Sequence, residues 1–171
     1  MSPSIKFCGL TRRADARLAA SLGASYGGVI LAAGGKRSIT PAAAADLFRD
    51  LSLTRVGVFV DAGLDEVRHA ADEAGLDVLQ LHGSEPPAEL AALRAEGRWK
   101  VWKAVRPRSA AELRDALELY RLDADALLVD GWSASAPGGT GSRFPWEEIS
   151  AHRDEIPDSP ASCAWYFASH C

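Results

Sequence analysis

Two residues place an ionisable side chain where proton-transfer chemistry is favoured. Cys8 ends the first apolar run and precedes Gly9 and a predicted helix start, whose dipole lowers the pKa of a thiol. Cys8 is therefore a candidate general base, or else a buried cysteine packed as a small hydrophobe. Asp130 directly follows the apolar residues 126–129, so its carboxyl emerges from a buried strand. This carboxyl suits acid–base chemistry, although turns and N-caps at strand exits also favour Asp.

Two further side chains can contact a small polar or anionic substrate. Arg37, in the loop segment Lys36-Arg37-Ser38, carries a guanidinium suited to bidentate binding of a carboxylate or phosphate. The alternative for this segment is a solvated loop. His82, in Gln80-Leu81-His82-Gly83, can donate to a substrate or stay neutral beside a backbone carbonyl.

A glycine-rich segment follows Asp130 in a loop from Gly131 to Phe144, and it consists of Gly138, Gly139, Thr140 and Gly141. Glycines permit close backbone approach, so a mobile lid or an anion contact is one interpretation. The spacing differs from a Walker motif and no Lys follows, so the segment alone predicts no nucleotide site.

The metal-binding residue types are few and scattered. The three cysteines form no C-x-x-C pair, and the four histidines lack the i, i+4 spacing of a helical metal site. Neither a metal nor a disulfide framework is expected. These residues are Cys8, Cys163, Cys171, His69, His82, His152 and His170.

The elements that must position these residues alternate along the chain. Short apolar runs rich in β-branched residues predict strands at 5–8, 26–31, 55–60, 77–81, 100–105 and 125–130. Between them, apolar residues at steps of three and four predict helices, the first with the stripe Ala14, Leu18 and Leu22. The predicted caps are Thr11, Thr40 and Ser109 at N-termini and Gly23, Gly75 and Gly97 at C-termini, with Pro41 at a first helical position.

Nearly continuous apolar strands such as 56–60 indicate a parallel sheet covered on both faces. A doubly wound sheet and a (β/α)8 barrel both fit this periodicity. Polar residues stand at the strand ends, where a barrel would make them converge. The first loop is no dinucleotide fingerprint, which also favours the barrel. The strand-end residues are Lys6, Cys8, Asp61, Gln80, His82, Lys103, Arg106 and Asp130.

Composition limits the class of partner. The 171 residues are 47% hydrophobic and 25% charged, as in an ordinary globular domain. The net charge of -4 offers no basic excess for nucleic acid. No apolar run approaches the roughly 20 residues that cross a bilayer, and the start of the chain is no signal peptide, so we expect a cytoplasmic protein without membrane partners.

Seven segments in register resemble the phosphoribosylanthranilate isomerase family. They are Lys6 to Thr11, Lys36 to Ser38, Val56 to Val60, Gln80 to Gly83, Lys103 to Val105, Leu128 to Gly131 and Gly138 to Gly141. The resemblance covers residues 4 to about 157. It implies a (β/α)8 barrel that binds a small phosphorylated substrate and catalyses an Amadori rearrangement, the third step of tryptophan biosynthesis from chorismate. No cofactor is implied.

The resemblance also implies roles for individual residues. Asp130 would be the general acid that opens the ribose ring, and Cys8 the general base that removes the proton on C2. Arg37 matches the residue that holds the anthranilate carboxylate, and residues 138–141 match the mobile loop over the site. His82 matches a residue at the barrel mouth.

After about Pro157 the chain departs from the family pattern. Residues 1–157 are expected to form an incomplete barrel of about six βα units, and residues 158–171 an atypical tail resembling a frameshift or premature stop. The last two units, whose loops commonly bind phosphate, would be missing. Open sheet edges would then favour self-association. The alternatives are a catalytically silent, self-associating fragment, or another phosphosugar barrel such as indole-glycerol-phosphate synthase.

Overall fold

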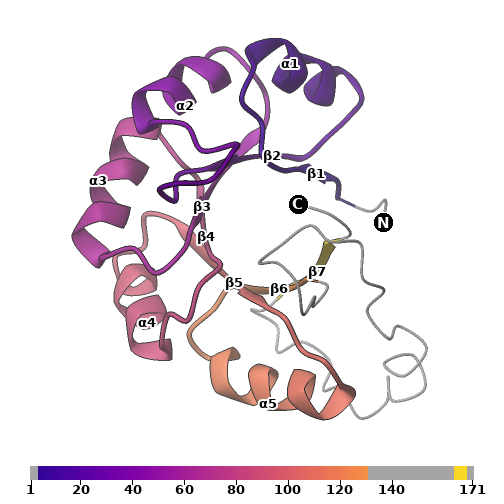
Figure 1. The fold of residues 1–171 in the computed structure, drawn as a ribbon, viewed down its shortest axis with the longest axis vertical. Helices are drawn as coiled ribbons and strands as arrows, with labels where there is room; N and C mark the ends of the chain where they lie inside the picture. Colours follow the sequence, from indigo (N-terminus) through magenta and orange to yellow (C-terminus); the bar gives the residue numbers. More distant parts are fainter. Residues whose placement is uncertain (1–3, 131–163, 169–171) are drawn as a thin grey trace. The chain divides into compact units, whose positions relative to one another are not determined.

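The computed structural model describes residues 4–130 and 164–168, which form alternating strands and helices (Figure 1). The chain divides into two compact units, Met1–Glu85 with Glu96–Lys100 and Pro86–Ala95 with Val101–Cys171. The strands and helices predicted from hydrophobic periodicity are present in both units.

The first unit holds four parallel strands in its described residues, and they pair in chain order. Figure 1 shows the helices of this unit on one side of its sheet. A doubly wound sheet would carry helices on both sides, so this arrangement favours the barrel. The elements are β1 (Lys6–Phe7), α1 (Arg13–Ser21), β2 (Tyr26–Ile30), α2 (Pro41–Phe48), β3 (Thr54–Phe59), α3 (Leu64–Ala74) and β4 (Val78–Leu81).

The second unit continues the alternation, with strands that are again parallel and paired in chain order. Its described elements are α4 (Pro87–Ala95), β5 (Lys100–Val105), α5 (Ala110–Tyr120), β6 (Ala126–Asp130) and β7 (Ala164–Ala168). Lys100, the first residue of β5, groups with the first unit.

Strand β7 comes from the segment that departs from the family pattern. It pairs with β6 along its whole length, from Ala126 opposite Ala164 to Asp130 opposite Ala168. All six predicted strands are therefore present, and five residues of the tail add a seventh strand.

Local signals account for several of the helix ends. Thr40 and Ser109 each accept a hydrogen bond from the backbone N–H three residues ahead, at 3.2 Å in both cases. Gly75 ends α3 in the left-handed conformation, with φ of 61°. The predicted cap at Thr11 is wrong, because α1 begins at Arg13 and Arg12 precedes it without a side-chain cap.

Each unit has buried apolar residues on its strands and on its helices. Val56, Val58 and Phe59 of β3 are buried, as are Leu90 and Leu93 of α4. The stripe predicted for the first helix is wrong. In α1 the buried residues are Ala16 and Ala19, whereas Leu18 and Leu22 are exposed.

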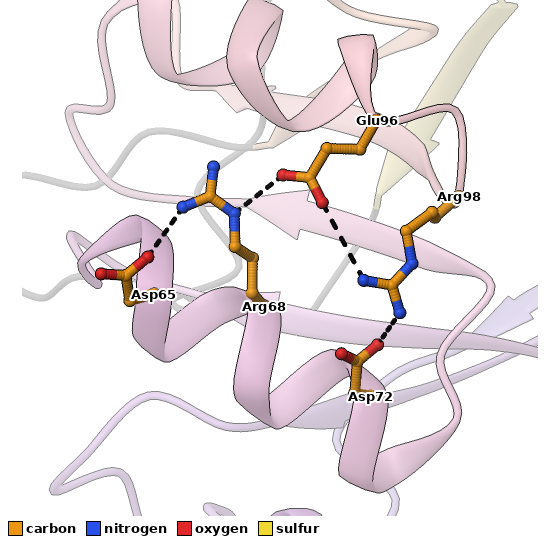
Figure 2. A network of polar contacts seen from close by, with 5 residues as sticks. All are labelled: Asp65, Arg68, Asp72, Glu96 and Arg98. Carbon is orange, nitrogen blue, oxygen red and sulfur yellow. Dashed lines mark hydrogen bonds and ion pairs between the residues drawn. The ribbon is translucent and has the colours of Figure 1, made fainter.

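A network of charged side chains connects α3 to the segment that follows α4 (Figure 2). Arg68 donates to Asp65 at 2.8 Å and to Glu96 at 2.7 Å. These two acceptors raise the pKa of the Arg68 guanidinium. Arg98 pairs with Glu96 at 3.9 Å and also with Asp72. The network holds residues 96–98 against α3, although each exposed pair contributes little by itself.

Within residues 4–130 and 164–168, no helix combines the length and the apolar character needed to cross a bilayer.

Candidate active site

The loop after β1 is built around a glycine that lies against Arg37. Gly9 has a φ of 74°, a conformation that side chains other than glycine rarely adopt. A Cβ at this position would come within 2.4 Å of Arg37 Nη1. The same nitrogen donates to the carbonyl oxygen of Cys8 at 3.5 Å, a weak hydrogen bond. Arg37 is therefore held beside Cys8 by a loop from the next repeat.

The thiol of Cys8 shares its surroundings with an ammonium group. A Cβ on Gly28 of β2 would lie 3.1 Å from Lys6 Nζ and 3.2 Å from Cys8 Sγ. Both side chains therefore occupy the space that this glycine leaves open. Helix α1 begins only at Arg13, whereas Lys6 and Arg37 both bring a cationic group close to Cys8.

Lys6 also belongs to a polar chain that joins β1 to β4. Its Nζ donates to Gln80 Oε1 at 2.9 Å, and Gln80 Nε2 lies 3.1 Å from His82 Nδ1. Gln80 is fully buried, and Lys6 and His82 are half-buried. The sequence identifies Lys6, Gln80 and His82 as strand-end polar residues. It gives no sign that Lys6 contacts Gln80, because the two residues are 74 positions apart in the chain.

A buried carboxylate organises the loops after β3 and β4. Glu85 is only 3% exposed, and Oε1 accepts from the backbone N–H of Asp61 and of Gly83, each at 3.0 Å. The Asp61 carboxylate accepts from the N–H of Ser84 at 2.6 Å, and Asp61 itself has a φ of 50°. Sequence reasoning missed Glu85. The only signal in the sequence for this role is that an acidic residue follows shortly after His82 and Gly83.

In the second unit, Asp130 ends β6 and is 3% exposed. Arg106, which follows β5, places its Nε 3.6 Å from Asp130 Oδ2. This contact places a guanidinium beside a buried carboxylate at the carboxyl ends of β5 and β6.

The predicted site residues therefore fall into three groups. Cys8, Arg37 and His82 lie at strand ends and loops of the first unit, and Asp130 lies at a strand end of the second. Gly138, Gly139, Thr140 and Gly141 lie outside the described residues. The described part of the chain contains no group of three or more His, Cys, Asp or Glu side chains placed to hold a metal ion.

The chain consists of parallel βα repeats, and ionisable side chains lie at the carboxyl ends of its strands. This combination is typical of an enzyme of the (β/α)8-barrel class. The model of the family described as N-(5'phosphoribosyl)anthranilate (PRA) isomerase matches residues 5–159. The chain belongs to this family. The fold class and the isomerase step of tryptophan biosynthesis predicted from the resemblance are thereby confirmed.

Individual relatives agree with the family assignment. The N-(5'-phosphoribosyl)anthranilate isomerase of Geobacter sp. strain M21 is 41% identical over 153 residues, which cover 88% of this chain and 72% of the relative. The crystal structure of the Thermus thermophilus phosphoribosyl anthranilate isomerase is 37% identical, with a TM-score of 0.74, and the match covers 86% of this chain and 70% of that one.

A further solved isomerase of this family was crystallised in complex with reduced 1-(o-carboxyphenylamino)-1-deoxyribulose 5-phosphate. It is 26% identical with a TM-score of 0.76, and the match covers 98% of this chain and 77% of that one.

Proposed function

We propose that this chain converts N-(5'-phosphoribosyl)anthranilate to 1-(2-carboxyphenylamino)-1-deoxyribulose 5-phosphate with Asp130 as general acid and Cys8 as general base. The family match across residues 5–159 carries this proposal, because it spans both residues. Their positions add support, since Asp130 is a buried strand-end carboxyl and Cys8 lies beside an ammonium.

The reaction then needs two proton transfers by the protein. Asp130 donates its proton to the ring oxygen as the bond between that oxygen and C1 breaks. The nitrogen lone pair forms the C1–N double bond of a Schiff base. Cys8 then removes the proton on C2, and the electrons of that C–H bond form a C1–C2 double bond while the nitrogen regains its lone pair. The resulting enolamine tautomerises to the ketone product.

Three further assignments belong to the same proposal. Arg37 binds the anthranilate carboxylate, which suits an exposed guanidinium held against the loop that carries Cys8. His82 contacts the substrate at the mouth of the site. The segment Gly138, Gly139, Thr140 and Gly141 closes over it. No cofactor takes part in these steps.

The acid assignment is tested by Asp130→Asn, whose amide cannot donate the proton that opens the ring. We expect a fall in turnover of at least about a hundredfold, measured as loss of anthranilate fluorescence. Asp115→Asn, the same change on the exposed face of α5, is the matched control. Turnover of the Asp130 variant within about threefold of the parent would refute the assignment, since general acid catalysis is worth far more.

Cys8→Ser tests the base in the same assay, because a hydroxyl gives almost no anion near neutral pH. Modification of Cys8 by a thiol reagent, located by mass spectrometry, should abolish turnover in the parent. Complementation of a tryptophan auxotroph by the parent chain separates the isomerase from a silent fragment.

Location and assembly are also part of the proposal. We expect the protein in the cytoplasmic fraction of cells. We also expect it to self-associate through sheet edges, which sedimentation would measure.

A further inference from the structure

The chain of side chains that joins Lys6, Gln80 and His82 has a defined direction. The first contact, at 2.9 Å, joins Lys6 Nζ to the side-chain oxygen of Gln80. An ammonium group has three donors and no acceptor, so only the oxygen of an amide can face it. The NH₂ group of Gln80 must then face the imidazole of His82, where it lies 3.1 Å from Nδ1.

This direction fixes the tautomer of His82. An amide NH₂ can only donate, so Nδ1 of His82 must accept and cannot carry a proton. In a neutral imidazole the proton is then on Nε2. Gln80 is fully buried within β4, so neighbouring atoms hold its amide in one orientation.

We propose that Gln80 is a positioning residue that holds His82 as the Nε2–H tautomer, so that Nε2 donates a hydrogen bond to an oxygen of the phosphorylated sugar substrate. This inference rests on the proposed function. It makes His82 a neutral hydrogen-bond donor rather than a proton carrier, and it leaves proton transfer to Cys8 and Asp130. Lys6 is the group that orients Gln80, and the same contact keeps its ammonium above Gly28 beside the thiol.

The tautomer can be measured without any catalytic assay. In ¹⁵N-labelled protein the protonated and bare imidazole nitrogens have well-separated chemical shifts, and we expect His82 to show a proton on Nε2 and none on Nδ1. His69, on the exposed face of α3, provides the comparison within the same spectrum. Its resonances are assigned with His69→Gln, a change remote from the strand ends.

Two variants test the direction of the chain. Gln80→Glu keeps an acceptor for Lys6 but presents a carboxylate to Nδ1, so the proton of His82 should move from Nε2 to Nδ1. Lys6→Met removes the donor that orients the amide, so the Nδ1–H form should appear beside the Nε2–H form. Circular dichroism checks that each variant is folded. If one variant does not fold, the other is sufficient to test the direction of the chain.

Binding provides the second measurement, with reduced 1-(o-carboxyphenylamino)-1-deoxyribulose 5-phosphate as the probe. Loss of one hydrogen bond should weaken its Kd about tenfold in Gln80→Glu, with His69→Gln unchanged.

The results separate this inference from the proposed function. A parent His82 protonated on Nδ1, or an unchanged tautomer in both variants, would overturn the positioning role of Gln80 while leaving Cys8 and Asp130 unaffected. An unchanged Kd in a variant whose tautomer has switched would overturn the donor role of His82. A parent with the expected tautomer that does not bind the probe would overturn the proposed function, and the donor role with it.

Discussion

At the scale of single residues, Gly9 serves two purposes at once. Its left-handed backbone turns the chain after Cys8, and its missing side chain leaves the space that the Arg37 guanidinium occupies. Any Cβ there would strain the backbone and also displace the group proposed to bind the substrate carboxylate.

We expect Gly9→Ala to lower the free energy of unfolding by about 1–2 kcal/mol and to raise the KM of the isomerase reaction severalfold. Gly23→Ala is the matched control, because Gly23 has a φ of 83° and open space around it. That variant should lose similar stability, measured by denaturant unfolding, but keep its KM. Equal KM values in the two variants would show that Arg37 does not depend on Gly9.

The same scale shows what sequence reasoning reaches and where it stops. Cys8 and Asp130 are recognisable because each follows or ends an apolar run, and the structure places Cys8 directly after β1 and Asp130 at the end of β6. The contact of Lys6 with Gln80 is not recognisable from the sequence, because it depends on the order in which β1 to β4 pair and on the rotamers of the two side chains. No local pattern carries that information.

At the scale of elements, Glu85 ties together the two loops that follow β3 and β4. Its carboxylate accepts from backbone groups of both loops while it is almost fully buried. A buried acceptor that loses its charge no longer satisfies these donors equally well.

Glu85→Gln is therefore expected to destabilise the fold by about 1–3 kcal/mol and to speed hydrogen exchange at the amides of Asp61 and Gly83. Glu66→Gln, on the exposed first turn of α3, should change neither. Unaltered exchange at both amides in the Glu85 variant would mean that other contacts hold the loops.

The sequence predicts where the strands and helices lie along the chain better than it predicts which face of a helix is buried. The short apolar runs rich in β-branched residues predict every strand from β1 to β6 to within two residues of its ends. In α1 the prediction of the buried face fails because Ala and Leu occur on more than one side of a nine-residue helix. The small residues Ala16 and Ala19 pack inward, and periodicity alone does not rank them above Leu18 and Leu22.

At the scale of the whole molecule, β7 covers the edge of β6 that would otherwise be open. The change in composition after residue 157 predicts a departure from the repeat, yet residues 165–167 are Trp, Tyr and Phe, which favour strands. Their β propensity was the local signal for β7. It could not show which strand would accept them.

Tyr166→Pro tests the importance of this pairing, because proline has no backbone N–H and fits poorly in the middle of a paired strand, where Tyr166 lies opposite Leu128. We expect the variant to release β7 and to self-associate through β6, which sedimentation velocity would detect at micromolar concentration. Tyr166→Val, which favours a strand, should sediment like the parent. Identical sedimentation of all three proteins would show that β7 does not protect this edge.

The order of strand pairing has a consequence for the time at which the molecule folds. Among the described strands of each unit, every strand after the first pairs with the described strand that precedes it in the chain. A strand leaving the ribosome thus finds its docking edge already synthesised and never waits for a distant C-terminal partner. At the usual rate of about 5–20 residues per second, a repeat follows its predecessor within a few seconds, so folding can keep pace with translation.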